Sequence, residues 1–243
     1  LVALGSVPAP KHRDLLDGAL GFDLYDAAAL PTMRAALGEL TSGRVLVSIL
    51  GGPFACPPAP FEAVLIVDEL VRARGVRDDV DVVISTPQPM TLPVAGPDAS
   101  AFVASHVQAR GIELLAGRAV REVDHDGGRV VFADDTDLEV SVLLGVPAAS
   151  APPVLAAAGM VGDSGFVEPD VATMCTAFEQ VYAIGDCTHV PNAVGALPKA
   201  GVFAAAEGEV AAANLAADLL GGQRRTLDGH GYCFLELPGE QVA

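Results

Sequence analysis

The chain has 243 residues, of which 51% are hydrophobic, and it contains no tryptophan. This content is sufficient for one large domain or two smaller ones with aliphatic cores. The formal net charge of −17 excludes a surface that attracts nucleic acid or anionic lipid headgroups. We expect no membrane-spanning helix, because prolines interrupt the longest uncharged stretch, residues 140–162, and no signal peptide at the start.

The first residues, Leu1–Ser6, form an apolar run that ends in a glycine turn. We interpret this run as a buried strand. Natural chains seldom begin inside a strand, so we expect the sequence to lack its true N-terminus. Residues 7–40 mix turn and helix patterns.

Strands and helices alternate in the next segment. Apolar runs without alternation predict the fully buried strands of a parallel sheet, and Gly75 and Gly111 predict the ends of two helices. The predicted order is a strand at 44–50, a helix at 60–74, a strand at 80–84, a helix at 98–110 with Asp98 as its N-cap, and a strand at 112–115. This order predicts a doubly wound parallel sheet.

Residues 118–140 change to alternating polarity, with a hairpin turn at Asp126–Gly128, and therefore predict a small antiparallel meander. Residues 141–146 are apolar again. The remaining sequence predicts a strand at 180–184, a helix from about Pro198 to Leu220, and one short alternating strand in residues 231–240.

Residues 51–62, GGPFACPPAPFE, occupy a strand-to-helix turn of the kind that often binds a dinucleotide pyrophosphate. Prolines at 53, 57, 58 and 60 remove four backbone N–H donors, and Glu62 adds a negative charge. The turn is therefore poorly suited to a nicotinamide dinucleotide, and it presents Cys56 instead. Alternatively, Cys56 is an inert thiol like Cys175 and Cys187, since no two cysteines have C-x-x-C spacing.

Residues 176–186, TAFEQVYAIGD, place Gly185 and Asp186 at the end of a predicted strand. Glycine lets the backbone approach a ligand, and the carboxylate can accept a hydrogen bond from a sugar or ribityl hydroxyl. The helix that follows has a small-residue start at Gly201, whose N–H groups suit an electron-rich oxygen such as that of a reduced flavin. Alternatively, Asp186 only forms a turn or caps a helix.

This segment resembles the C-terminal FAD motif of the pyridine nucleotide–disulfide oxidoreductase superfamily, T-x-x-x-x-V-Y-A-x-G-D, whose aspartate contacts the ribityl chain of FAD. The opening LVALGS resembles the family's A-T-G strand, with Leu4 in place of the usual threonine. The resemblance implies an α/β two-dinucleotide-binding-domain flavoprotein fold: a Rossmann-like parallel sheet with an antiparallel meander. It also implies an N-terminal truncation, because the family's first G-x-G-x-x-G has no counterpart.

The same resemblance implies four segments. They are a first piece of the FAD-binding domain at 1–40, an inserted NAD-domain-like Rossmann domain at 41–148, a second piece of the FAD-binding domain at 149–222, and a C-terminal interface tail at 223–243.

The turn around Cys56 is similar to the C-x-P-A-P-[FY]-E stretch of sulfide:quinone oxidoreductases and flavocytochrome c sulfide dehydrogenases. The resemblance implies that Cys56 pairs with Cys233 in a redox-active disulfide and that Glu62 relays a proton. It also places Lys199 of LPKAG beside the flavin ring. The cofactor-binding residues it implies are Gly185, Asp186, Leu197, Pro198, Lys199 and Gly201.

The implied reaction begins when sulfide attacks the disulfide and releases a thiolate, which adds to the flavin C4a and delivers two electrons. The flavin then passes them to a quinone or a cytochrome. The expected partners are therefore sulfide or a small sulfur species and one of these acceptors, with no nucleic acid and no metal. Peripheral membrane contact and a homodimer are left open, and the expected location is the cytoplasm or the membrane periphery.

Two other functions are compatible with the sequence. One is an NAD(P)H-dependent flavoprotein reductase, such as a type II NADH dehydrogenase or a ferredoxin reductase; the missing second glycine motif argues against it. The other is a non-catalytic fragment or scaffold that does not hold FAD. The alternative for Cys233 itself is an ordinary strand residue.

Overall fold

The computed structural model describes residues 1–193, 195–239 and 241–242. The chain forms two compact units, each made of segments that are separated in sequence. Unit 1 consists of Leu1–Pro8, Pro53–Pro57 and Ala149–Cys233. Unit 2 consists of Ala9–Gly52, Pro58–Ala148 and Phe234–Ala243.

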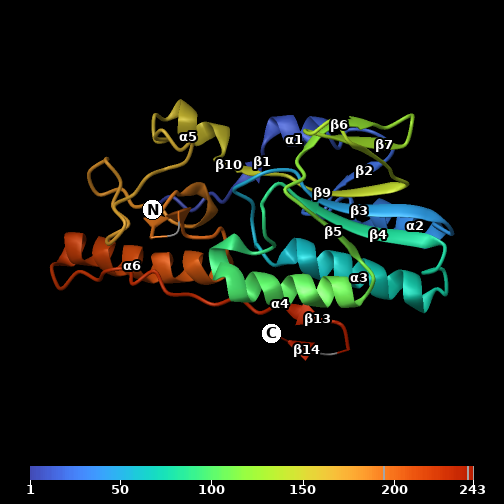
Figure 1. Ribbon diagram of the computed structural model, residues 1–243. Coiled ribbons are helices and arrows are strands. Elements are labelled where there is room, and N and C mark those ends of the chain that lie inside the picture. Colours follow the sequence, from blue (N-terminus) through green and yellow to red (C-terminus); the bar gives the residue numbers. More distant parts are fainter. Residues whose placement is uncertain (194, 240, 243) are drawn as a thin grey trace. The chain divides into compact units, whose positions relative to one another are not determined.

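Unit 2 is built on a five-stranded parallel sheet with the strand order β2-β9-β3-β4-β5 (Figure 1). The strands are β2 (Gly21–Asp23), β3 (Gly43–Ile49), β4 (Val80–Thr86), β5 (Glu113–Ala116) and β9 (Val142–Val146). The central strands are almost wholly buried, which agrees with their continuous apolar runs. The predicted α/β class with a parallel sheet is confirmed.

Helices α3 (Ala59–Ala73) and α4 (Gly96–Ala109) lie along one side of this sheet (Figure 1). Both were predicted, but the prediction that Asp98 is an N-cap is wrong. The N-cap of α4 is Ala95, and Asp98 lies in the first helical turn. The helix begins earlier because Pro97 fits a first turn, where its missing N–H is not needed. The shorter helices of unit 2 are α1 (Pro10–Asp14), α2 (Leu30–Glu39) and η1 (Pro93–Ala95).

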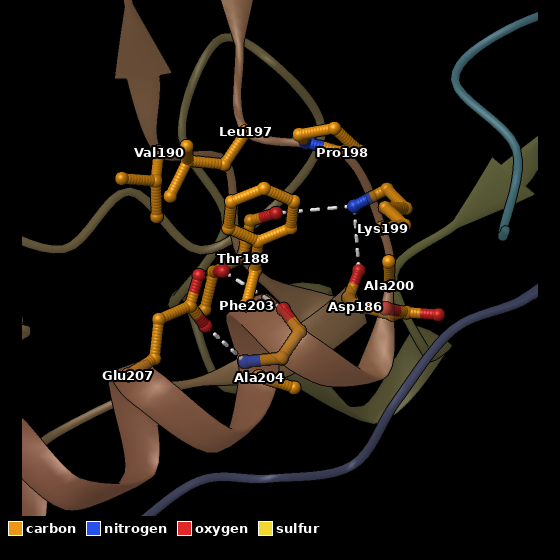
Figure 2. Close-up of a pocket in the computed structure, with 11 residues that line it drawn as sticks. Asp186, Thr188, Val190, Leu197, Pro198, Lys199, Ala200, Phe203, Ala204 and Glu207 are labelled. Carbon is orange, nitrogen blue, oxygen red and sulfur yellow. Dashed lines mark hydrogen bonds between the residues drawn. The ribbon is translucent and has the colours of Figure 1, made fainter. Parts of the chain in front are cut away.

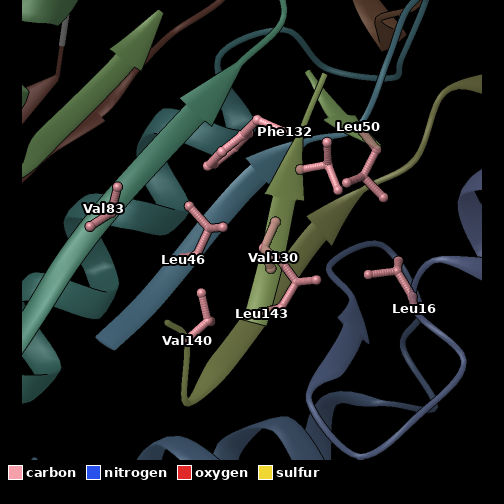
Figure 3. Close-up of a cluster of buried hydrophobic side chains, with 9 residues drawn as sticks. Leu16, Leu46, Leu50, Val83, Val130, Phe132, Val140 and Leu143 are labelled. Carbon is pink, nitrogen blue, oxygen red and sulfur yellow. The ribbon is translucent and has the colours of Figure 1, made fainter. Parts of the chain in front are cut away.

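The predicted meander forms a separate three-stranded antiparallel sheet. Its strands are β6 (Val120–Asp124), β7 (Arg129–Phe132) and β8 (Asp137–Glu139). Figure 3 shows how Val130 and Phe132 of the meander gather with Leu46, Val83 and Leu143 of the parallel sheet in one buried cluster. The core of unit 2 is therefore mainly aliphatic, as the composition predicts.

A buried ion cluster joins the helices of unit 2. The Asp68 side chain on α3 is fully buried and accepts hydrogen bonds from Arg72 at 2.8 Å, Arg77 at 2.6 Å and Arg110 at 2.7 Å. Burial alone would raise the pKa of Asp68, but these three guanidinium groups hold it below its ordinary value. Two of these arginines also donate hydrogen bonds to backbone carbonyls: Arg72 to Arg110 O and Arg77 to Gly111 O.

Unit 1 contains one long helix and several short elements. They are the antiparallel pair β1 (Val7–Pro8) and β10 (Ala149–Ser150), helix α5 (Pro153–Ala157), the turn η2 (Gly185–Cys187), the pair β11 (Pro191–Asn192) and β12 (Gly195–Ala196), and helix α6 (Gly201–Leu220). One buried cluster brings Met174 and Tyr182 against Val210 and Ala211 of α6. The predicted long helix is confirmed, with Gly201 as its first residue.

The strands predicted at 1–6 and 180–184 are wrong as continuous strands. Val2 N–H donates to Tyr182 O at 2.7 Å and Ile184 N–H donates to Val2 O at 2.9 Å, which makes one isolated parallel bridge. Leu1 and Leu4 are exposed. A strand needs successive paired residues, whereas within the described residues 1–6 only Val2, which is half-buried, takes part in a bridge.

The predicted single strand in residues 231–240 is also wrong. The tail instead forms a short hairpin of β13 (Glu236–Leu237) and β14 (Gln241–Val242), and Glu240 lies outside the described residues. Residues 231–235 belong to no strand.

The contacts also place residues 9–40 in unit 2, because β2 pairs with β9. The assignment of the predicted segments to flavin-binding and nucleotide-binding domains stays a prediction. None of the helices in the described ranges is long and apolar enough to cross a membrane.

Candidate functional site

The turn η2 follows the Ile184 backbone and is held from two sides. Gly185 adopts a φ of 74°, a left-handed conformation that favours glycine. Its N–H donates to Glu207 Oε2 at 2.6 Å, and its carbonyl accepts from Thr188 Oγ1 at 2.8 Å. This fixed turn determines where the next residue, Asp186, presents its carboxylate.

The Asp186 carboxylate lies beside the opening segment of the chain. Ser6 Oγ is 3.4 Å from Asp186 Oδ2, at the long end of the hydrogen-bond range. Asp186 is half-buried, and an ionised carboxylate has about four acceptor positions. The side chain therefore keeps the capacity to accept hydrogen bonds from a ligand hydroxyl, as the sequence predicts.

Lys199 is buried, and its ammonium group is used within unit 1. Its Nζ donates to Asp186 O at 2.6 Å and to Thr188 O at 3.0 Å, as Figure 2 shows, and lies 3.6 Å from the centre of the Phe166 ring. Burial lowers the pKa of Lys199 to about 8, although nearby acidic groups, Asp186 first, oppose that shift. The site thus holds a cation whose charge is incompletely compensated.

Glu207 is a buried carboxyl group that sequence reasoning missed. Burial raises its pKa above the ordinary value, while the hydrogen bond from Gly185 N–H and the charge of Lys199 oppose the shift. The sequence does contain a signal, because Glu207, Val210, Ala211 and Asn214 have helical spacing and form the buried stripe of α6. An acidic residue on such a stripe indicates a buried partner.

These side chains surround a cavity of about 10 Å³, room for about one water molecule. Five of the six predicted cofactor-binding residues line it. The lining residues are Gly185, Asp186, Thr188, Val190, Leu197, Pro198, Lys199, Ala200, Phe203, Ala204 and Glu207. The sixth, Gly201, begins α6, whose N-terminus carries no side-chain cap. Phe203 N–H donates to Ala200 O at 3.1 Å, so among the first described N–H groups those of Gly201 and Val202 are the ones that an electron-rich atom could use.

The loop that carries Cys56 pairs with the segment that carries Lys199. Cys56 N–H donates to Lys199 O at 2.7 Å, and Ala55 and Lys199 form a parallel bridge inside unit 1. Cys56 has a φ of 50°, which is unfavourable for a residue with a Cβ atom and is often found at functional sites. A cysteine with an unfavourable backbone conformation thus lies next to Lys199.

The glycine at position 51, in the turn before Cys56, has a packing reason within unit 2 and does not by itself indicate a phosphate site. A Cβ atom at Gly51 would collide with the His12 ring, so close packing alone requires glycine there. Pro58 is the N-cap of α3 and Glu62 lies in its first turn. Both features disfavour an anion at this helix start.

Of the other predicted catalytic residues, Glu62 contacts the C-terminal tail three residues after Cys233. Glu62 Oε1 accepts a hydrogen bond from Glu236 N–H at 2.9 Å. Cys233 is exposed and is the last residue of unit 1. The pairing of Cys56 with Cys233 stays a prediction, as does proton relay by Glu62. Cys187, by contrast, is buried and donates to Ile184 O, and burial raises its thiol pKa.

Comparison with known proteins connects this site to a family. The profile described as pyridine nucleotide-disulphide oxidoreductase matches residues 64–207. A mitochondrial sulfide:quinone oxidoreductase of Schizosaccharomyces pombe is 25% identical over 157 residues, which cover 62% of this chain and 34% of that protein. The chain therefore spans about a third of the length of this curated relative.

Two solved structures share the fold. The sulfide:quinone oxidoreductase of Aquifex aeolicus superposes with a TM-score of 0.76 at 18% identity, covering 89% of this chain and 53% of that chain. An NAD-dependent persulfide reductase from A. fulgidus superposes with a TM-score of 0.70 at 19% identity, covering 97% and 41%. Together with the family match, these relatives support the predicted FAD cofactor.

Proposed function

We propose that this chain, which belongs to the pyridine nucleotide-disulphide oxidoreductase family, is part of an FAD-dependent enzyme that oxidises sulfide through Cys56 and Cys233 and passes the electrons to a quinone or a cytochrome. One observation carries the proposal. The N–H of Cys56 is bonded to the carbonyl of Lys199, so a strained cysteine lies beside the residues predicted to hold the flavin.

The residues of unit 1 have the chemistry that a flavin requires. Asp186 would accept hydrogen bonds from the ribityl hydroxyls, as its half-buried carboxylate still has acceptor capacity. The uncapped start of α6 and the Lys199 ammonium would stabilise negative charge on the reduced ring. When bound, the flavin would accept two electrons and pass them on to the acceptor.

The cysteines would carry the sulfur chemistry. Hydrosulfide attacks one sulfur of the Cys56–Cys233 disulfide, forming a new S–S bond as the old one breaks. One cysteine becomes a persulfide and the other leaves as a thiolate, which retains the electron pair of the broken bond. A second sulfide would take the outer sulfur of the persulfide and leave that cysteine as a thiolate as well. Joining the two thiolates would restore the disulfide and release two electrons, which a bound flavin would accept.

The NAD(P)H-dependent alternative has less support. The turn that should bind the pyrophosphate lacks four N–H groups, its Gly51 is explained by packing against His12, and Glu62 places a negative charge in the first turn of α3. The persulfide reductase among the structural relatives is described as NAD-dependent, so this alternative is tested directly.

The test uses the full-length flavoprotein under anaerobic conditions. We expect sulfide to bleach the flavin absorption and NADH to leave it unchanged. Cys233→Ser should slow bleaching by sulfide roughly a hundredfold, because the thiolate relay is lost. Cys175→Ser is the matched control and should keep the parent rate. Bleaching by NADH alone, or an unchanged rate in Cys233→Ser, would contradict the proposal.

A further inference from the structure

We propose that Glu62 is a positioning residue: it anchors the C-terminal tail to α3 and thereby keeps Cys233 within reach of the loop that carries Cys56. This inference rests on the proposed function, because it concerns the same cysteine pair. It assigns to Glu62 a role that depends on a hydrogen-bond acceptor and not on proton transfer.

The contact itself joins two distant parts of the sequence. Glu62 Oε1 accepts from Glu236 N–H at 2.9 Å, although the two residues are 174 positions apart. Glu62 lies in the first turn of α3, and β13 contacts the same helix. A hydrogen bond to an ionised carboxylate is stronger than one between neutral groups.

Burial around Glu236 shows that the tail is held on more than one point. Leu235 and Leu237 are buried, with 6% and 8% of their surfaces exposed, whereas Glu236 between them is exposed. Alternate residues of an extended chain face the same side, so the two leucines anchor the segment. The N–H of Glu236 is then the polar contact that sets its register on α3.

The anchor limits how far apart the two cysteines can lie, because few residues separate each cysteine from the Glu62–Glu236 contact. Cys233 precedes Glu236 by three residues, which span at most about 11 Å when fully extended. Cys56 precedes Glu62 by six residues, of which the last are already helical. With the anchor closed, the path between the two thiols runs through these few residues. Loop closure over a short path raises the effective concentration of one thiol at the other.

Proton relay and anchoring place different chemical requirements on the side chain of Glu62. A proton relay requires a group that ionises, so Glu62→Gln would abolish it. An anchor requires only an acceptor oxygen, which the glutamine amide retains, so Glu62→Gln would preserve it. Glu62→Ala removes both.

The experiment measures the disulfide and not the enzymatic rate. The full-length protein is equilibrated in glutathione buffers of graded ratio, the thiols are trapped by alkylation, and the Cys56–Cys233 linked peptide is quantified by mass spectrometry. We expect Glu62→Ala to lower the equilibrium constant for this disulfide about tenfold, and Glu62→Gln to stay within about twofold of the parent. Glu69→Ala, an exposed residue on the same helix, is the control and should match the parent.

The tail offers an independent variant if Glu62→Ala does not fold. Glu236→Pro removes the donor N–H and should reproduce the effect of Glu62→Ala, whereas Glu236→Ala keeps the N–H and should match the parent. Equal disulfide stability in the parent, Glu62→Ala and Glu236→Pro overturns the anchor while leaving the cysteine pair intact. A parent protein that forms no Cys56–Cys233 disulfide at any ratio overturns both the anchor and the proposed sulfur chemistry.

Discussion

Both units bury charged side chains, but they compensate those charges differently. In unit 2, the Asp68 carboxylate receives hydrogen bonds from three arginines, and its pKa is held low. In unit 1, Lys199 and Glu207 lie on the same small cavity, and burial shifts the pKa of each toward its neutral form.

This difference in charge compensation distinguishes the structural cluster around Asp68 from the candidate site around Lys199 and Glu207. A fully compensated buried charge stabilises one arrangement of the chain and has little capacity left for a ligand. An incompletely compensated one costs stability in the folded protein, and a ligand of suitable charge can supply what is missing. Four predictions compare the two regions, from the largest expected effect to the smallest.

Removing the carboxylate of Asp68 should have the largest effect on stability. We expect Asp68→Ala to lower the free energy of unfolding by about 3–5 kcal/mol, because three partly buried guanidinium groups lose their shared partner. Asp81→Ala, which breaks the exposed pair with Arg44, is the control and should cost about 1 kcal/mol or less. Urea denaturation at pH 7 measures both.

The same cluster has a defined pH dependence. Because the folded pKa of Asp68 lies below its ordinary value, the stabilisation is complete above that value and is lost as the pH falls through the folded pKa. The parent should therefore approach the Asp68→Ala variant in acid. A constant difference between the two proteins down to pH 2 would contradict the compensation described for this cluster.

Lys199 should affect stability in the opposite direction and in another pH range. Its folded pKa of about 8 lies below the ordinary value of 10.5, so the buried charge costs stability below pH 8 and the cost disappears as the pH rises toward 10.5. Relative to Lys199→Met, the flavin-free parent should gain on the order of 3 kcal/mol across this range. Lys11→Met, the exposed lysine, is the matched control. Parallel stability curves for the parent and Lys199→Met would show that Lys199 carries no such cost.

The smallest effect concerns the backbone at the turn η2. Gly185→Ala should destabilise the protein by about 1–2 kcal/mol, because alanine is unfavourable in the left-handed conformation. The added Cβ would make only an ordinary contact with Ala204, so the cost comes from the backbone. In unit 2, Gly38→Ala within α2 has open space and should stabilise by about 0.5–1 kcal/mol. Thermal unfolding should show shifts of opposite sign.

Local patterns were sufficient for much of unit 2. Continuous apolar runs predicted β3 and β4, and helix-stop glycines placed the ends of α3 and α4 within a residue or two. Unit 1 was harder to predict. Tyr182 and Ala183 are buried and take part only in isolated bridges, and periodicity alone cannot distinguish such a segment from a strand.

The residues of the candidate site also differ in how well the sequence predicted them. A short motif identified Asp186 and Lys199, which lie together on the cavity. Glu207 was recognisable only as one position on a helical stripe, and nothing local links Glu62 to Glu236. Contacts between residues far apart in the sequence depend on the whole chain path, which neither propensity nor spacing encodes.

The division of the chain into interleaved units has a consequence for biosynthesis. The parallel sheet of unit 2 needs no strand beyond Val146, so it can assemble while later residues are still being translated. The core of unit 1 must wait for α6. Cys56 leaves the ribosome with the early part of the chain and Cys233 only after α6. The proposed disulfide can therefore form only after α6 has been translated, later than the strands of the parallel sheet.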